Sequence, residues 1–90
     1  MTTYTWDETK RQSNLRKHAL DFADAPFVLE RITYTEEDIS LDYAERRYKS
    51  IGFFNGREVV VVYTEHDDEV RIISFREASH HERKTFYQRS

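Results

Sequence analysis

The chain has 90 residues, a formal net charge of -3 and no cysteine. This length fits one small domain, taken here as residues 1–90, and the missing cysteine excludes both a disulfide framework and a thiolate metal site. No apolar run approaches the length of a membrane span, and the first residues lack the pattern of a signal peptide, so we expect a soluble, cytoplasmic protein that does not bind membranes.

The charges are arranged in blocks. Two basic blocks, residues 46–58 and 71–90, alternate with two acidic blocks, residues 30–45 and 65–69. A fold that joins the basic blocks would form a surface for an anionic partner. Ordinary mixing of surface charges would produce the same pattern without a partner.

The N-terminal third predicts a short strand and two helices. Residues 4–6 alternate aromatic and β-branched side chains, which indicates a strand with Trp6 in the core, rather than a platform for RNA bases. Asp7 is a suitable N-cap for a helix that reaches His18. A second helix should begin near Asp21, unless Pro26 delays its start or kinks it. The apolar stripe of this second helix would contain Phe22, Ala25, Val28, Leu29 and, if the helix extends that far, Ile32.

Four polar side chains share one face of the first helix. Lys10, Asn14, Lys17 and His18 stand at i, i+4, i+7 and i+8. Two ammonium groups, an amide and an imidazole are the groups that bind and cleave a phosphodiester. His18 is the best acid–base candidate because the pKa of a free imidazole lies near neutrality. Alternatively, His18 is a helix C-terminal residue favoured by the helix dipole.

The rest of the chain predicts an antiparallel meander and a closing helix. Residues 32–35 form a weak strand candidate, followed by an acidic loop over 36–38. The strand Arg47–Phe54 is joined through Asn55-Gly56, a strong hairpin signal, to a strand over 57–65. Its segment 59–62 is apolar on both faces, so this strand should be central. After the polar residues 66–68 comes a third strand over 69–76, and the Ser79–Glu82 capping box begins the last helix. The fold class is therefore α+β.

The hairpin register predicts which residues share a sheet face. With a two-residue turn at 55–56, Arg47 faces Thr64, and a turn over 66–69 makes Thr64 face Arg71. Arg47 and Arg71 would then lie two strand spacings apart, roughly 10 Å, close enough to hold one phosphate with its sugar. Arg76 is an odd number of residues further on, so it points to the opposite face unless a bulge intervenes. The alternative is two surface arginines paired with the acidic loop.

At these residues the chain resembles the BrnT family of toxins from bacterial type II toxin–antitoxin systems. The resemblance extends over residues 4–87. The matching residues are Trp6, Asp7, Lys10, Asn14, Lys17, His18, Phe22 and Ala25 in the first part, and Arg47, Ile51, Gly52, residues 71–74, Arg76, Ala78, Glu82, Arg83 and Tyr87 in the second.

The resemblance implies a small RelE-like ribonuclease domain that cleaves RNA and inhibits translation. It also implies a BrnA-like ribbon–helix–helix antitoxin, which we expect to join the toxin as a heterotetramer around an antitoxin dimer. Operator DNA would be bound only through this antitoxin. Two positions depart from the family pattern. Ala19 stands where a glycine is common, which puts the orientation of His18 in question, and Phe75 stands where a small alanine is usual and could fill space needed by RNA or antitoxin.

These observations lead to a metal-independent endoribonuclease as the first hypothesis. His18 or a deprotonated Lys17 would transfer the proton, Arg47 and Arg71 would hold the phosphoryl oxygens, and Arg76 or Tyr87 would assist the leaving group. The catalytic set is thus Lys17, His18, Arg47, Arg71, Arg76 and Tyr87. We assign RNA binding to Lys10, Asn14, Lys49 and Arg83, and structural roles to Trp6, Asp7, Phe22, Gly52, Ser79 and Glu82.

We expect no metal and no cofactor, because no His-x3-His pair or carboxylate cluster has ligand spacing and no glycine-rich phosphate loop is present. The first alternative is a non-catalytic module of the same fold that binds RNA or an acidic protein. A second alternative is a small structural subunit that only assembles with a partner.

Overall fold

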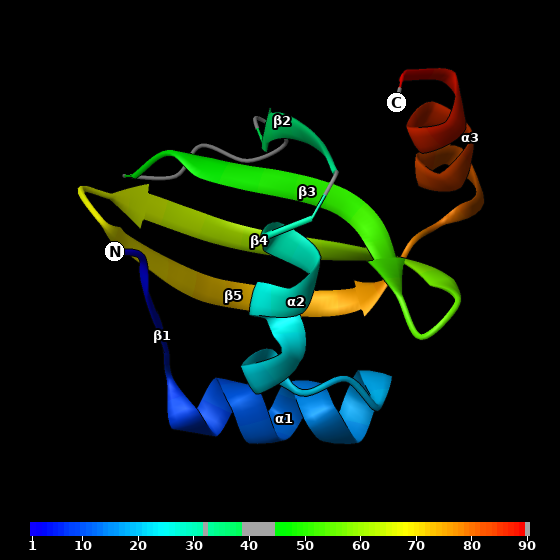
Figure 1. Ribbon diagram of the computed structural model, residues 1–90. Coiled ribbons are helices and arrows are strands. Elements are labelled where there is room, and N and C mark those ends of the chain that lie inside the picture. Colours follow the sequence, from blue (N-terminus) through cyan, green and yellow to red (C-terminus); the bar gives the residue numbers. More distant parts are fainter. Residues whose placement is uncertain (32, 39–44, 90) are drawn as a thin grey trace.

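The computed structural model describes residues 1–31, 33–38 and 45–89. Five strands form one mixed sheet in the spatial order β1-β5-β4-β3-β2, in which β1 runs parallel to β5 and the other neighbours are antiparallel (Figure 1). The α+β prediction is therefore confirmed. In chain order the elements are β1 (Thr3–Trp6), α1 (Glu8–His18), the 3₁₀ turn η1 (Phe22–Asp24), α2 (Ala25–Leu29), β2 (Tyr34–Asp38), β3 (Arg47–Phe54), β4 (Arg57–His66), β5 (Glu69–Glu77) and α3 (His80–Arg89).

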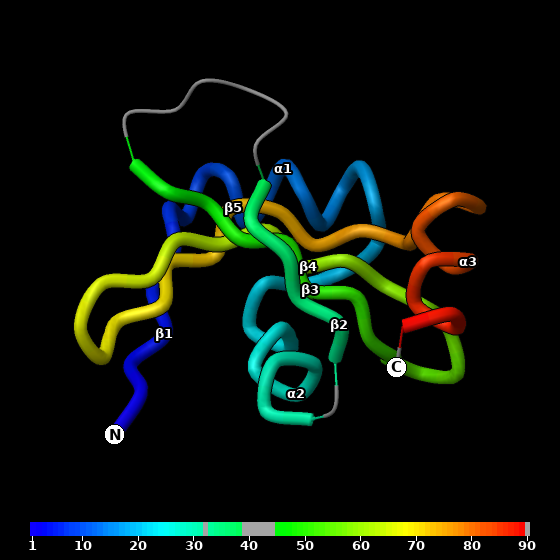
Figure 2. Tube along the Cα trace, turned by 90° about the horizontal axis from the view of Figure 1, so that it is seen from above, coloured from blue at the N-terminus to red at the C-terminus, as the bar shows by residue number. Residues whose placement is uncertain are grey.

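The helices lie at three different places around the sheet. Helix α2 and turn η1 cover one face, α3 covers one end of the opposite face, and α1 runs along the β5 edge (Figure 1). Viewed from above, α1 and α2 lie on opposite sides of the strands (Figure 2). We call the two sides of the sheet the α2 face and the α3 face. Among the described residues, helix α3 covers only part of the α3 face.

The central strand β4 supplies apolar side chains to both faces, as its sequence predicts. Val59 and Val61 belong to the main core with the fully buried Phe22, whereas Val60 packs with Phe86 of α3 in a smaller cluster. Alternation along a strand sends successive side chains to opposite faces, so an unbroken valine run requires cover on both. The meander therefore holds the two helical layers together.

Both meander turns contain residues with positive φ. Asn55 and Gly56 have φ of 52° and 76°, the pattern of a type I′ turn. Asp67, in the second turn, has a φ of 54°. The resulting register pairs Phe54 with Arg57, so the predicted first hairpin is confirmed.

The caps of the N-terminal helices also follow the sequence. The Asp7 carboxylate accepts a hydrogen bond of 3.0 Å from the Lys10 amide, as predicted for the N-cap. Ala19 ends α1 in the left-handed conformation, with φ 59° and ψ 27°. Asp21 caps η1, and α2 itself begins only at Ala25, so Pro26 falls in its first turn. Of the two options for Pro26, the later start is correct.

Two expectations about the fold are wrong. The acidic residues 36–38 belong to β2 and not to a loop. They pair in turn with Lys49, Tyr48 and Arg47 of the neighbouring strand β3, and two of these three partners carry the opposite charge. Phe75 does not occupy space beside the site: it is fully buried in the main core, edge-on to Phe54. Ile32, the possible last member of the α2 stripe, lies outside the described residues.

Candidate active site

Arg47 and Arg71 lie on the α3 face, on either side of Thr64. Thr64 pairs with Arg47 on β3 and with Arg71 on β5, which confirms the predicted register. The two arginines are separated by two strand spacings, roughly 10 Å between Cα atoms. Thr64 is buried between them, while Arg71 is exposed. The α3 face thus carries guanidinium groups far from the helix that covers its other end.

A bulge in β5 brings Arg76 onto the same face. Val62 pairs with Ser74 and Tyr63 pairs with Ile72, so Ile73 is the additional residue on β5. One additional residue reverses the alternation beyond it. In a regular strand, Arg71 and Arg76 would point to opposite faces because they are an odd number of residues apart. The bulge puts both side chains on the same face, which is the exception that the sequence analysis allowed.

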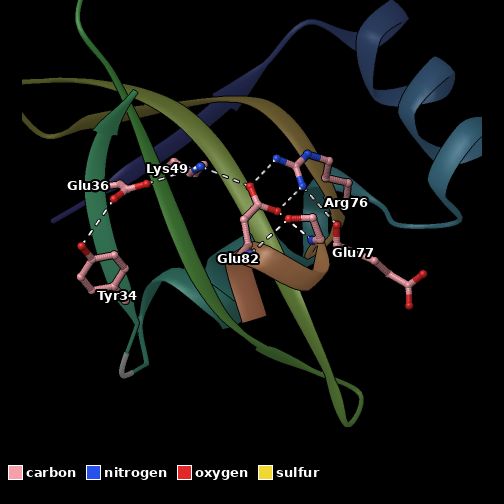
Figure 3. A network of polar contacts seen from close by, with 7 residues as sticks. Tyr34, Glu36, Lys49, Arg76, Glu77 and Glu82 are labelled. Carbon is pink, nitrogen blue, oxygen red and sulfur yellow. Dashed lines mark hydrogen bonds and ion pairs between the residues drawn. The ribbon is translucent and has the colours of Figure 1, made fainter. Parts of the chain in front are cut away.

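Glu82 of α3 connects Arg76 to β3 and β2 through a network of charges (Figure 3). The Arg76 guanidinium donates to the two Glu82 oxygens at 2.8 and 2.9 Å. The Lys49 ammonium lies 3.2 Å from Glu82 and 3.4 Å from Glu36. Glu82 also closes the predicted capping box, accepting from the Ser79 amide at 2.8 Å. Arg76 and Lys49, assigned to catalysis and RNA binding, therefore have carboxylate partners within the protein.

The network is reflected in the pKa of its members. Hydrogen bonds from Arg76 lower the pKa of the Glu82 carboxyl far below its usual range, and this outweighs the opposing effect of burial. Burial lowers the pKa of Lys49, but the hydrogen bonds and charges of Glu82 and Glu36 raise it to a greater extent. Each of these shifts favours the charged form of its group, and the network joins two cations, Arg76 and Lys49, to two carboxylates, Glu82 and Glu36.

Asn14 fixes α1 to the open part of the β5 edge. Strand β1 pairs with β5 only as far as Ile72. Beyond it, the Asn14 side chain donates to the Phe75 carbonyl at 2.8 Å and accepts from the Phe75 amide at 3.2 Å. It also donates to the Leu20 carbonyl at 3.0 Å. Asn14 is buried, and these hydrogen bonds give its side-chain amide a structural role within the protein.

The anchored helix presents its polar face to a small groove on β5. This groove has a volume of about 220 Å³ and is polar. Lys10, Lys17 and His18 line it from α1, and Ser74, which pairs with Val62 on the α3 face, lines it from β5. Asn14, the fourth residue of the predicted helix face, also lines it, with its side-chain amide bound to the backbone of Leu20 and Phe75. We call this hollow the lysine groove.

His18 is half-buried at the C-terminal end of α1. Burial lowers its pKa, and the positive charges of Lys17 and Arg76 lower it further. The shift favours the neutral form of the imidazole, which can accept a proton. Because the charge of Arg76 on β5 lowers the pKa of His18 on α1, these two candidate site residues interact electrostatically.

Tyr87 and Arg83 lie at the other end of the sheet. The Tyr87 hydroxyl donates to the Glu58 carboxylate, which raises the pKa of this phenol, and its ring lies 6.3 Å from that of Phe53. Glu58 is six residues along β4 from Thr64, about 20 Å in a strand. The structure does not bring Tyr87 together with Arg47 and Arg71. Arg83 is bound to the Ala78 carbonyl at 2.8 Å.

The residues assigned to structure occupy the positions that hold these elements. Phe22 is fully buried, Trp6 packs against the same core, and the buried Gly52 pairs with Val59. Sequence reasoning missed two features: the contact of Asn14 with β5 and the connection from Glu82 to the sheet. For the contact of Asn14 with β5, the sequence offers no signal beyond a single asparagine on a helix. The capping box identified Glu82 as a helix residue but contained no information about Arg76.

The described residues contain no group of three or more His, Asp or Glu side chains arranged to hold a metal ion. None of the helices in this part of the chain combines the length and the hydropathy that crossing a membrane requires.

Comparison with known proteins gave one family. The model described as "Ribonuclease toxin, BrnT, of type II toxin-antitoxin system" matches residues 6–82. This range includes α1, the whole meander and the first residues of α3, and thus every group of the lysine groove and the Glu82 network. A search of curated proteins gave no match.

Proposed function

The chain belongs to the BrnT family of ribonuclease toxins from type II toxin–antitoxin systems, and from this premise we propose that it cleaves RNA without a metal ion and so inhibits translation. One observation carries the proposal: the imidazole of His18, whose pKa is lowered by burial, lines the lysine groove together with Lys10 and Lys17. Cleavage through the 2′-hydroxyl of RNA needs a proton acceptor next to a site for the phosphate, and these groups supply both.

His18 takes the role of general base. It accepts the proton of the 2′-hydroxyl while this oxygen forms a bond to phosphorus. The bond from phosphorus to the 5′-oxygen breaks, and that oxygen takes a proton from the solvent or from an acidic group. The products are a 2′,3′-cyclic phosphate and a 5′-hydroxyl end. The reaction needs no oxidant, cofactor or external nucleophile.

The cations of α1 and the α3 face stabilise the additional negative charge on phosphorus. Lys17, in the groove with His18, is next to the reacting phosphate, and Arg71 and Arg47 hold the flanking phosphates along the α3 face. A guanidinium fork matches the oxygens of a phosphate better than an ammonium does. Because Arg76 is paired with Glu82, we assign it to the electrostatic environment of His18 and not to the leaving group.

The partner is an antitoxin, as the type II family implies. We propose a BrnA-like ribbon–helix–helix protein, joined as a heterotetramer around an antitoxin dimer, which also carries the complex to operator DNA. The toxin itself would have a RelE-like fold; its helices and antiparallel meander are compatible with this fold.

Incubation of the purified protein with end-labelled RNA in the presence of a chelator tests the function. We expect cleavage to persist, and His18→Ala to reduce its rate by about 10²- to 10⁴-fold, the usual contribution of a general base. Arg71→Ala should weaken RNA binding and its dependence on salt. His66→Ala, which removes an exposed histidine at the end of β4, is the matched control.

Two outcomes would contradict the proposal. Unchanged cleavage after both His18→Ala and Arg71→Ala would exclude the site. Salt-sensitive RNA binding without any cleavage would instead support the non-catalytic binding module.

A further inference from the structure

A second pocket adjoins His18, and apart from His18 it shares no lining residue with the lysine groove. It has a volume of about 310 Å³ and lies between the C-terminal end of α1 and the β3–β4 hairpin, which Figure 1 shows above that end of the helix. His18 lines both pockets. The residues that line it are His18, Ala19, Leu20, Phe54, Asn55, Arg57, Val59 and Glu77.

The charges of the two pockets differ. The lysine groove contains two ammonium groups and no carboxylate. The second pocket contains one guanidinium and one carboxylate, from Arg57 and Glu77, which form an ion pair of 2.9 Å. A cationic groove attracts a phosphate, whereas a pocket with balanced charges has no such preference and suits a neutral, polar group. In RNA the neutral group next to the phosphate and ribose is the base.

From these features we propose that the second pocket binds the base of the nucleotide whose 2′-hydroxyl attacks, and that it selects guanine. The inference rests on the proposed function. With His18 as the shared wall, a ribose beside the imidazole has its phosphate in the lysine groove and its base in the second pocket. Cleavage should therefore follow guanine, on its 3′ side.

The side chains of this pocket match guanine better than the other bases. Guanine presents two neighbouring donors, N1–H and N2–H, which fit the two oxygens of a carboxylate such as Glu77. Beside them, its O6 and N7 are acceptors that fit a guanidinium such as that of Arg57. Adenine and cytosine can donate to a carboxylate only through their single exocyclic amine, and uracil has no exocyclic amine.

The pocket also has an apolar wall against which a base can lie. Phe54 is half-buried, and its ring is held edge-on to Phe75, with 5.7 Å between the ring centres. Splayed bases of single-stranded RNA are commonly held by aromatic side chains and by hydrogen bonds to their edges. Asn55, fixed with positive φ in the hairpin turn, borders the opening.

Sequencing the ends of RNA fragments tests this inference on the wild-type protein and on Glu77→Gln. For the wild type we expect guanine at the 3′ end of most upstream fragments. For Glu77→Gln we expect cleavage after guanine to fall roughly tenfold relative to cleavage after the other bases, the usual discrimination from one bidentate contact. The Glu77 side chain is 58% exposed, so its removal should not unfold the protein.

Glu37→Gln is the matched control. Glu37 is also a strand carboxylate in an exposed ion pair, 3.3 Å from Arg46, but it lies in β2 at the far edge of the sheet. This variant should keep the guanine preference of the wild type. Cleavage without enrichment of any base, or an equal guanine preference in Glu77→Gln, would overturn the subsite while leaving the ribonuclease function intact.

Nucleotide binding separates the subsite from catalysis. We expect guanosine 3′-monophosphate to bind at least about tenfold more tightly than adenosine 3′-monophosphate, and Glu77→Gln to remove this difference. A protein that does not cleave RNA but shows this selectivity would refute the proposed function and keep the subsite. Equal affinity for the two nucleotides would refute the subsite.

Discussion

From the lowered pKa of His18 we predict how the rate of RNA cleavage depends on pH. A general base must be neutral, so kcat/KM should fall as the pH drops through the His18 pKa, below the usual value for histidine. Burial is the largest cause of the shift and the Lys17 charge the next. Lys17→Gln should therefore move the acidic limb of the profile to higher pH, in addition to lowering the rate.

Lys10→Gln is the control for this measurement. Lys10 lines the same groove but is not among the charges that lower the pKa of His18. Its loss should weaken RNA binding without moving the acidic limb. A profile that keeps its acidic limb in Lys17→Gln would show that His18 is not the titrating group.

Asn14 is the residue whose role depends most on tertiary structure. Asn14→Leu would leave the amide and carbonyl of Phe75 without their partner and should destabilise the protein by roughly 2–4 kcal/mol. Urea denaturation measures this change. Gln12→Leu, which removes an exposed amide from the same helix, should change the stability by less than about 0.5 kcal/mol. Equal stability of the two variants would mean that Asn14 does not anchor α1.

This residue also marks a limit of sequence-based prediction. The helical spacing correctly placed Asn14 beside Lys10, Lys17 and His18. Whether that face meets solvent or another element depends on where β1 stops pairing with β5, and this is a property of the whole sheet. The same pattern therefore contains two residue types that we propose act on RNA and one that holds the fold together.

At the scale of elements, the end of α1 is strained. Ala19 adopts a left-handed conformation that costs an L-residue roughly 1–2 kcal/mol relative to glycine. Ala19→Gly should thus stabilise the protein by about 1 kcal/mol and raise its Tm by roughly 4–8 °C. Ala23→Gly, at an exposed alanine in η1 without positive φ, should instead lower the Tm. A lower Tm for Ala19→Gly would contradict the strained cap.

The elements themselves were largely predictable from local signals. Asn55-Gly56 set the first hairpin, and the register that followed placed Arg47 and Arg71 correctly on one face. The bulge at Ile73 could not be anticipated, because neither a glycine nor another local signal marks it. The β2 assignment failed for a related reason: the basic residues of β3 that compensate its acidic side chains are distant in sequence.

At the scale of the whole molecule, Glu82 ties α3 to two strands, β5 through Arg76 and β3 through Lys49. Its pKa is lowered in the folded state, so the unfolded chain binds more protons at acidic pH and the free energy of unfolding decreases as the pH falls. The loss begins near the ordinary glutamate pKa of about 4.3 and continues toward the lower folded pKa. Glu82→Gln should cost about 3 kcal/mol at pH 7, because Arg76 loses its counter-charge.

Urea denaturation of both proteins between pH 7 and pH 3 checks this account. The difference in unfolding free energy between wild type and Glu82→Gln should narrow as the pH falls, since the unfolded wild-type chain binds a proton at Glu82 that the folded protein does not, and the variant has no carboxyl group there. Glu37→Gln, with its exposed ion pair, should differ from wild type by at most about 1 kcal/mol at pH 7. If the difference in unfolding free energy between wild type and Glu82→Gln stays constant down to pH 3, the charge of Glu82 does not stabilise the folded protein.

The chemistry at the RNA ends tests the central claim, that His18 activates the 2′-hydroxyl of RNA without a metal ion. Mass spectrometry of fragments produced in the presence of a chelator identifies these ends directly. The account predicts a 2′,3′-cyclic phosphate on the upstream fragment and a 5′-hydroxyl on the downstream one, both absent after His18→Ala. Fragments with a 3′-hydroxyl and a 5′-phosphate, or cleavage that stops when the chelator is added, would contradict it.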